Sequence, residues 1–238
     1  MSTLYIVATP IGNLADMTYR AVEVLANVEI IACEDTRHTQ NLLNRYGISK
    51  RLIATHAHNE EHSAKGIIGL LKEGRDVAFV SDAGTPGISD PGSRLVECVR
   101  SSGFDVVPIP GASAFTALVS VAGYIGRSVH FEGFLSPKSG RRKKRLEELL
   151  GRDESFVFYE SPFRVVKVLE ELSALEPGRR IVVGREMTKK FEEFLTGPVE
   201  EVLGILKGRQ AVKGEFTLLV APKEAGGSDD HDQETEEP

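Results

Sequence analysis

Short apolar runs and longer amphipathic stretches alternate regularly along the first half of the chain. Runs such as "VAFVS" at 77–81 hold the β-branched and aromatic residues that favour strands. The stretches between them repeat apolar residues every three or four positions, which predicts helices with one buried face. Strands separated by helices are typical of a wound, mostly parallel α/β sheet. The predicted strands are 4–9, 29–35, 52–58, 77–81 and 105–110, and the predicted helices are 18–28, 36–47, 60–74, 93–103 and 112–123.

The alternation is interrupted at Gly126–Ser128 and then continues with strands of more antiparallel character. We place a linker there, between an N-terminal α/β domain at 1–127 and a smaller mixed-sheet α/β domain at 128–223. Residues 224–238 show no apolar periodicity, so we expect a disordered acidic tail. The strands expected in the second half are 129–135, 155–161, 180–186, 190–197 and 214–222, and the helices are 162–175 and 199–206.

The formal net charge of −6 arises in the tail, which holds seven acids and no Lys or Arg. Without the tail, 28 acids remain against 29 bases, so the rest of the chain is nearly neutral. The two cysteines, Cys33 and Cys98, are too few for a disulfide framework. No apolar run approaches the ~20 residues that cross a bilayer, and no basic segment precedes the first apolar run. We therefore expect a cytoplasmic protein that does not enter a membrane.

Glycine- and proline-rich loops follow three of the predicted strands, at 9–14, 81–92 and 109–114. All three should open at the carboxyl edge of the sheet, where wound α/β folds bind ligands. No G-x-G-x-x-G follows the first strand and no phosphate-loop motif occurs, which disfavours NAD and ATP. Asp82 suits acceptance of hydrogen bonds from a ligand, and it suits a turn or cap equally well. Asp90, before Pro91, is expected to start the next helix.

Seven ordered blocks of the chain carry a resemblance to a known family: "LYIVATPIGNLADMTYRAVEVL", "IIACEDTRHTQNLL", "FVSDAGTPGISDPG", "PIPGASA", "FEGFL", "FYESPFRV" and "GREMTKKFEEF". They resemble the ribosomal RNA small-subunit methyltransferase I family, of the tetrapyrrole methylase superfamily. The resemblance extends to about Pro222. It implies a two-domain α/β enzyme, commonly a homodimer, that binds S-adenosylmethionine between its domains. It also implies 2′-O-methylation of a cytidine ribose in the decoding centre of 16S rRNA, within the 30S subunit.

The matching motifs also imply a set of cofactor-binding residues. The chain departs from the superfamily in one place, because it has Ser81-Asp82-Ala83 where tetrapyrrole methylases carry Gly-Asp-Pro. The aspartate is retained, and the backbone path after it is expected to differ. By resemblance, S-adenosylmethionine contacts Pro10, Ser81, Asp82, Thr85, Ser113, Ala114, Glu160 and Met187.

Methyl transfer to a ribose hydroxyl needs an acceptor for the hydroxyl proton, which contributes roughly 10²–10⁴ in rate. Glu34 and Asp35 follow the second predicted strand and are the candidate bases. The alternative for both is ion pairing or helix capping. Lys189 and Lys190 are further candidates, although a lysine base needs a strongly depressed pKa.

A basic run at 138–145 suggests a contact with an RNA phosphate backbone. Positive charge at a helix start opposes the helix dipole, so six cations there are expected to serve a partner. The alternative is a solvated helix face. The members of the run are Lys138, Arg141, Arg142, Lys143, Lys144 and Arg145.

Two other groups of residues, three histidines and three phenylalanines, are possible ligand contacts. His56, His58 and His62 have spacing atypical of a zinc site, so no metal is expected, and Asn59 beside them suits a helix cap. Phe131, Phe134 and Phe163 could flank an unstacked base, but core packing is the expectation for each.

Two rival functions remain open at this point. A tetrapyrrole C-methyltransferase would not need the basic run. A non-catalytic RNA-binding factor for ribosome assembly would have no affinity for S-adenosylmethionine.

Overall fold

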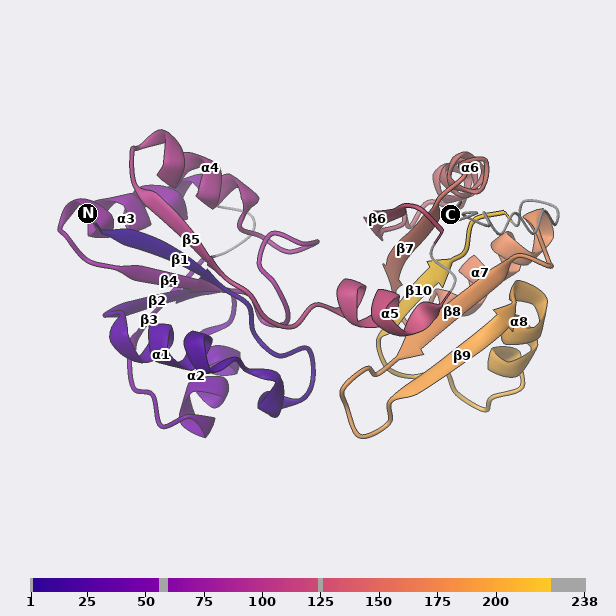
Figure 1. The fold of residues 1–238 in the computed structure, drawn as a ribbon, viewed down its shortest axis with the longest axis horizontal. Helices are drawn as coiled ribbons and strands as arrows, with labels where there is room; N and C mark the ends of the chain where they lie inside the picture. Colours follow the sequence, from indigo (N-terminus) through magenta and orange to yellow (C-terminus); the bar gives the residue numbers. More distant parts are fainter. Residues whose placement is uncertain (1, 56–59, 124–125, 224–238) are drawn as a thin grey trace, which may run out of the picture.

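The computed structural model describes residues 2–55, 60–123 and 126–223 and contains two five-stranded sheets, each with its own helices (Figure 1). The predicted acidic tail and His56, His58 and Asn59 lie outside the described residues. Within these ranges, no helix combines the length and apolar character needed to cross a bilayer. The elements of the first half are β1 (Thr3–Val7), η1 (Leu14–Asp16), α1 (Tyr19–Asn27), β2 (Ile30–Cys33), α2 (Thr36–Arg45), β3 (Arg51–Ala54), α3 (Glu60–Lys72), β4 (Val77–Val80), α4 (Ser93–Ser101), β5 (Asp105–Ile109) and α5 (Ala114–Ala122).

The first sheet is wholly parallel, in the order β3-β2-β4-β1-β5. Both central strands, β2 and β4, are fully buried, as their uninterrupted apolar sequences require. α1 and α2 cover one face and α3 and α4 cover the other. After β1 the chain continues to α1 on one face of the sheet, and after the neighbouring strand β4 it continues to α4 on the other face. This divergence opens a crevice at their carboxyl ends, which is the usual ligand site of such sheets.

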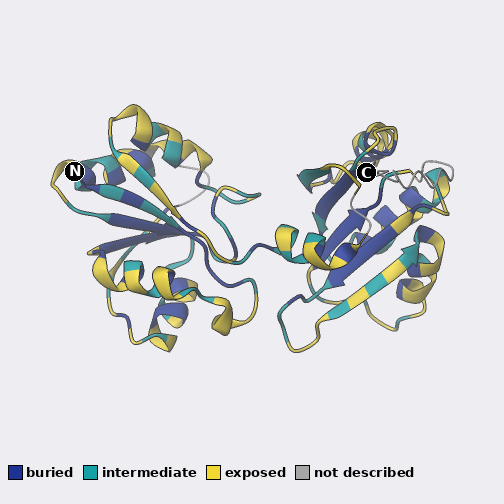
Figure 2. Cartoon of the chain, viewed as in Figure 1, coloured by how far each residue is buried: buried dark blue, intermediate teal, exposed yellow. Residues whose placement is uncertain are grey.

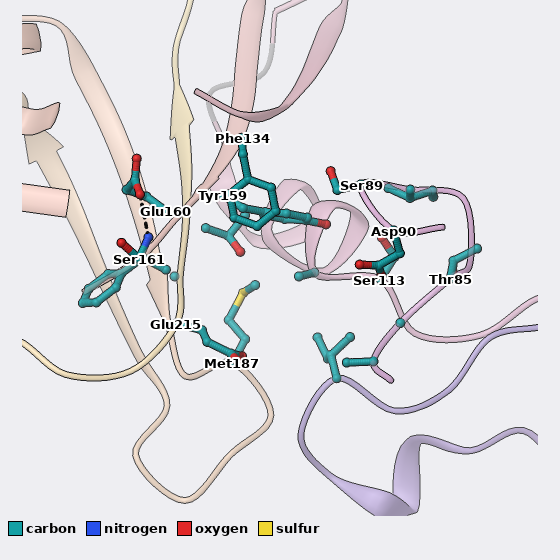
Figure 3. Close-up of a pocket in the computed structure, with 18 of the residues that line it drawn as sticks. Thr85, Ser89, Asp90, Ser113, Phe134, Tyr159, Glu160, Ser161, Met187 and Glu215 are labelled. Atoms are coloured by element: carbon teal, nitrogen blue, oxygen red, sulfur yellow. Dashed lines mark hydrogen bonds between the residues drawn. The ribbon is translucent and has the colours of Figure 1, made fainter. Parts of the chain in front are cut away.

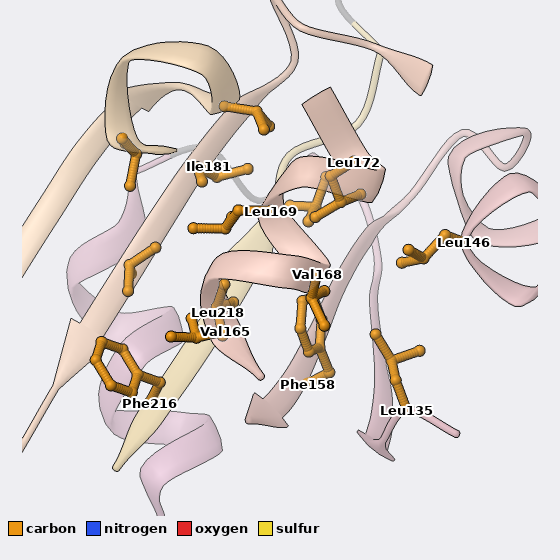
Figure 4. Close-up of a cluster of buried hydrophobic side chains, with 14 of the residues drawn as sticks. Leu135, Leu146, Phe158, Val165, Val168, Leu169, Leu172, Ile181, Phe216 and Leu218 are labelled. Atoms are coloured by element: carbon orange, nitrogen blue, oxygen red, sulfur yellow. The ribbon is translucent and has the colours of Figure 1, made fainter. Parts of the chain in front are cut away.

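The second sheet is mixed, in the order β6-β7-β10-β8-β9, and only β6 and β7 run parallel. α6, α7 and α8 cover one face and enclose the largest apolar core of the molecule (Figure 4). In Figure 2 the inner strands β7, β8 and β10 are coloured as buried along most of their length. The predicted α/β fold with one parallel and one mixed sheet is confirmed. The elements are β6 (Val129–Phe134), α6 (Ser139–Leu150), β7 (Ser155–Glu160), α7 (Val165–Leu175), β8 (Arg180–Arg185), β9 (Glu193–Pro198), α8 (Val199–Lys207) and β10 (Phe216–Val220).

Helix α5 packs on the second sheet although the sequence groups it with the first. Leu118 and Ala122 are buried against Val157, Val182 and Leu219, on the face that α6–α8 leave open. The helix therefore completes the core of the second half. We propose that the domain boundary lies between β5 and α5, upstream of the linker expected at 126–128.

Candidate active site

Loops at the carboxyl edge of the first sheet and strand ends of the second sheet enclose a cavity of about 350 Å³ (Figure 3). This volume lies within the range of small-molecule sites, roughly 300–1,000 Å³. The first half contributes Ile11 after β1, residues 83–85 and 88–90 after β4, and Ser113 and Ala114 after β5. The second half contributes the ends of β6, β7, β8 and β10. The three loops predicted to form a ligand site thus meet at one cavity.

The loop after β4 is fixed to both neighbouring loops. Thr9 and Gly84 exchange backbone hydrogen bonds of 2.8 and 3.0 Å, and Thr85 Oγ1 donates to the carbonyl of Ala112 at 3.1 Å. Gly84 has φ +80, and a Cβ there would lie 3.3 Å from Ile11 Cγ2. A glycine is therefore needed for this close approach. These bonds hold one wall of the cavity in place before a ligand arrives.

The ionisable side chains of the cavity wall are all acidic. Asp90, Tyr159, Glu160 and Glu215 line it, whereas no Lys, Arg or His does so in the part of the chain that the structure describes. The described wall thus lacks the cations that hold phosphates, so a dinucleotide or a nucleoside triphosphate is a poor fit. A positively charged ligand with apolar parts suits the same wall.

Asp90 faces Tyr159 across the upper part of the cavity (Figure 3). Burial raises the pKa of the Asp90 carboxyl above its ordinary value, and the nearby negative charge of Asp82 raises it further. Burial also raises the pKa of the Tyr159 hydroxyl. A half-buried carboxylate with a raised pKa is a stronger base than a solvated one. Asp90 therefore has the properties of a proton acceptor that opens into the cavity.

Glu160 has a structural task at the turn from β7 into α7. Its side chain is fully buried, and Oε1 accepts hydrogen bonds of 2.7 Å from the Ser161 amide and from Arg164 Nε. This pairing fixes the turn that brings Ser161 and Pro162 into the cavity wall.

A strained loop after β8 brings Met187 into the cavity. Glu186 and Thr188, on either side of Met187, have φ +51 and +67, a left-handed conformation that costs non-glycine residues of order 1 kcal/mol or more each. The Asn13 amide donates to Thr188 Oγ1 at 3.1 Å, which ties this loop to the first half. Strained backbone of this kind is concentrated at ligand sites.

Lys189 does not have the properties of a base. Its Nζ donates to Glu186 Oε1 at 3.1 Å and to Glu215 Oε2 at 2.8 Å. Burial lowers the pKa of the Lys189 ammonium, but the hydrogen bonds to Glu215 and Glu186 outweigh burial and leave the pKa raised. The ammonium remains protonated and supports the Met187 loop.

Comparisons with known proteins agree with this arrangement. The family model of tetrapyrrole (corrin/porphyrin) methylases matches residues 3–203. A protein named ribosomal RNA small subunit methyltransferase I, from Borrelia garinii subsp. bavariensis, is 49% identical over 92% of this chain and 98% of its own length. A protein of the same name from Bacillus subtilis is 43% identical over 98% of this chain and 79% of its own length. The chain belongs to the ribosomal RNA small subunit methyltransferase I family.

Solved structures with the same fold are more distant in sequence. The methyltransferase CobJ matches with a TM-score of 0.71 at 22% identity, over 94% of this chain and 95% of its own. Uroporphyrin-III C-methyl transferase from Thermus thermophilus, complexed with S-adenyl homocysteine, matches with a TM-score of 0.64 at 16% identity, over 92% of this chain and 97% of its own. At these identities the likeness establishes the fold that this methyltransferase I family shares with them.

The structure divides the cofactor residues implied by resemblance into two groups. Thr85, Ser113, Ala114, Glu160 and Met187 line the cavity. Pro10, Ser81 and Asp82 lie behind its wall: Pro10 is buried before Ile11, the Ser81 hydroxyl bonds to backbone carbonyls of its own loop, and Asp82 Oδ1 accepts from the Asp35 amide at 3.1 Å.

The candidate bases Glu34 and Asp35 do not line the cavity. Asp35 is the N-cap of α2, where Oδ1 accepts from the amides of Arg37 and His38. The Arg37 amide is the main reason that the pKa of Asp35 is lowered. For Asp35, the capping alternative agrees with the structure.

The sequence interpretation missed Asp90. The helix that Asp90 was expected to start begins at Ser93, with Gly92 as N-cap and no side-chain cap. The expectation was wrong because Gly87, Gly92 and the left-handed Ser89 turn this loop back toward the cavity instead of into the helix. The available signal was that Asp90 is an acidic residue in a loop that follows a buried strand.

The basic run is only partly available to a partner. Arg142 is buried and forms two 2.7 Å hydrogen bonds with Glu171, and Arg145 pairs with Glu132 at 2.7 Å. Two of the six predicted RNA contacts are therefore used inside the protein. Ion pairs within the described ranges do not involve the remaining four, which are exposed at the N-terminal end of α6: the N-cap Lys138, and Arg141, Lys143 and Lys144.

Two further expectations concern histidines and aromatics. The side chain of His62 lies outside the described part, as do His56 and His58; elsewhere in the described chain no cluster of three or more His, Cys, Asp or Glu side chains suits a metal. Core packing holds for Phe131 but is wrong for Phe134 and Phe163, which are 58% and 95% exposed.

Proposed function

We propose that the cavity binds S-adenosylmethionine and that the chain transfers its methyl group to the 2′-oxygen of a cytidine ribose in 16S rRNA of the small ribosomal subunit. The observation that carries this proposal is a cavity whose described wall is apolar and acidic and holds no cation, in a member of the methyltransferase I family. The name of these relatives gives the RNA and the subunit; the nucleotide comes from the motif resemblance. We place the enzyme in the cytoplasm as a homodimer.

The residues of the wall suit each part of the cofactor. Ile11, Ile88 and Phe216 offer apolar surface for an adenine. Met187 and the Tyr159 ring suit a sulfonium, because a thioether and an aromatic face are both polarisable. Carboxylates suit the amino group and the ribose hydroxyls. When bound, the cofactor supplies an activated methyl group on a positively charged sulfur.

The chain has to orient the ribose hydroxyl, exclude water and accept one proton. Bound S-adenosylmethionine would supply the methyl group, the oxygen–methyl bond forming as the carbon–sulfur bond breaks and its electron pair stays with sulfur. We propose that the hydroxyl proton passes to the Asp90 carboxylate. Asp90 opens into the cavity, is half-buried, and has a pKa raised by burial. Positioning supplies the larger part of the rate, because displacement needs oxygen, carbon and sulfur in line.

Tritium-labelled S-adenosylmethionine tests this function and its base together. Small subunits that lack their native rRNA methylations should acquire label from the wild-type chain. Asp90→Asn should bind S-adenosylmethionine within a few-fold of wild type and lose roughly 10²–10⁴ in kcat. Asp105→Asn, at an exposed position at the opposite edge of the sheet, is the matched control and should leave kcat unchanged. RNA that stays unlabelled although the cofactor binds tightly contradicts the proposed methyl transfer. Full activity of Asp90→Asn contradicts the proposal that Asp90 accepts the proton.

A further inference from the structure

We infer that Phe134, at the mouth of the cavity, is a stacking platform for the base of the nucleotide whose ribose enters the site. This inference rests on the proposed function and names how the RNA is held. It assigns a binding task to a residue that neither the cofactor nor the chemistry requires.

A β-bulge brings the Phe134 ring to the cavity. Phe131 pairs with Val157 across β6 and β7, but the next pairs are Gly133 with Phe158 and Phe134 with Tyr159, so one extra residue is inserted at Glu132. In a register without this bulge, Gly133 would lie opposite Tyr159. Because glycine has no side chain, β6 would then contribute none to this part of the wall. Bulges commonly redirect a side chain next to an active site.

Glycine at 133 makes the bulge possible. Its φ is +74, which disfavours any other residue, and an added Cβ would lie 2.9 Å from Ser89 Oγ in the loop after β4. The backbone of β6 therefore approaches the loop that carries Asp90. This contact positions Phe134 beside the part of the cavity where we place the reaction.

The Phe134 ring is held on one side and open on the other. Its centroid lies 5.6 Å from that of Tyr159 in an edge-to-face arrangement, which orients the ring. The residue nevertheless remains 58% exposed, while Met187 and Phe216 in the same wall are buried. A fixed, exposed aromatic ring suits a planar apolar partner.

The charges that follow Phe134 along the chain indicate the partner. Lys138, four residues after Phe134, is the N-cap of α6, and the exposed cations of that helix are Arg141, Lys143 and Lys144. An exposed aromatic ring followed within the next ten residues by exposed cations suits a single-stranded nucleic acid, whose phosphates and bases are recognised separately. The structure therefore offers separate positions for the ribose, the base and the phosphates: the cavity, Phe134 and α6.

Steady-state methylation of small subunits tests the inference with Phe134→Ala, Phe134→Trp and the control Tyr19→Ala. Tyr19 is 99% exposed and does not line the cavity. Stacking on an aromatic side chain is worth roughly fivefold to a hundredfold in affinity. We expect Phe134→Ala to raise KM for the subunit by about tenfold or more, with Kd for S-adenosylmethionine within about twofold. Phe134→Trp should restore KM, and Tyr19→Ala should match wild type.

The outcomes separate this inference from the function on which it rests. An active wild type with an unchanged KM in Phe134→Ala overturns the stacking and leaves the function standing. Loss of cofactor affinity in Phe134→Ala assigns the ring to the cofactor and also overturns it. A wild type that does not methylate the subunit overturns both. If the alanine variant unfolds, Phe134→Leu takes its place, because leucine keeps an apolar side chain without an aromatic ring. A raised KM in Phe134→Leu supports the stacking, and an unchanged KM overturns it.

Discussion

The backbone amide of Asp35 donates a hydrogen bond to Asp82 Oδ1 over 3.1 Å, and this bond joins the loop after β2 to the loop after β4. Asp82 thereby fixes the loop that carries the catalytic candidate Asp90. Its negative charge also raises the pKa of Asp90, after the larger effect of burial. A carboxylate that resemblance assigns to the cofactor thus acts here on the neighbouring wall of the cavity.

Asp82→Asn should move the acid limb of the pH profile of kcat to lower pH. Asp90 must be ionised to accept a proton, so kcat falls as the pH drops through its raised pKa. Asparagine can still accept the Asp35 amide but carries no charge, which lowers the pKa of Asp90. The measurement is kcat against pH with both substrates saturating. An acid limb that stays in place, or that moves to higher pH, contradicts this coupling.

Arg142→Ala should destabilise the fold strongly. Arg142 is buried, and it also donates to the carbonyls of Ser136 and Pro137 at 3.1 Å, besides its pair with Glu171. Removing one partner of a buried ion pair costs about 3–5 kcal/mol. Urea unfolding should show this loss, whereas Arg141→Ala, at an exposed position one residue earlier, should change the free energy of unfolding by less than about 0.5 kcal/mol. Equal effects of the two substitutions would show that Arg142 is not a structural residue.

The same ion pair should make stability depend on acid pH. Hydrogen bonds from Arg142 lower the pKa of Glu171 in the folded protein. The stabilisation is present above the unfolded pKa, about 4.3 for glutamate, and is lost as the pH falls through the folded value. Glu171→Gln should flatten this part of the pH-stability curve. An unchanged slope in that variant argues against the pair.

Neutralising the four exposed cations of α6 should weaken rRNA binding and reduce its salt dependence. For single strands the slope of log K against log salt changes by about 0.7 per phosphate contact, so four contacts change it by roughly 3. A control with the same change in charge replaces four cations at the amino edge of the first sheet, away from the cavity: Arg51, Lys72, Arg75 and Arg100. Identical slopes in both variants would make α6 a solvated face. The test substitutions are Lys138, Arg141, Lys143 and Lys144 to Gln.

Gly12→Ala should weaken cofactor binding through the loop that carries Met187. An added Cβ would lie 2.5 Å from Lys189 Cγ and 2.8 Å from Thr188 Oγ1, so the strained loop has to move. Calorimetric titration with S-adenosylmethionine should show a Kd raised several-fold. Gly69→Ala, with no atom within 4 Å of the added Cβ, should bind as wild type does. An unchanged Kd for S-adenosylmethionine in Gly12→Ala would show that this contact does not support the cofactor site.

The sequence was most informative where one local pattern decides the structure. The apolar strands β2 and β4 admit only a central, doubly covered position, and the loops after them had to share one edge. Helix α5 is apolar on most of its surface, so its pattern did not indicate which sheet it covers. Arg141 and Arg142 are adjacent and chemically identical, and the ion pair with Glu171, far along the chain, helps to make Arg142 structural.

Asp90 and Phe134 were unpredictable for a related reason. Asp90 lines the same cavity as Tyr159 from the other half, and the position of Phe134 depends on a one-residue bulge that shifts the strand alternation. The local sequence shows an acidic residue in a loop after a buried strand, but it does not show which residues of the other half lie opposite it.

The most direct test of the central claim is to incubate the chain with S-adenosylmethionine and under-methylated small subunits, digest the 16S rRNA with nucleases, and identify the modified nucleoside by mass spectrometry. We predict a single additional methyl group on the ribose of a cytidine. A methyl group on a base, or RNA that remains unmodified although S-adenosylmethionine binds tightly, would contradict the account.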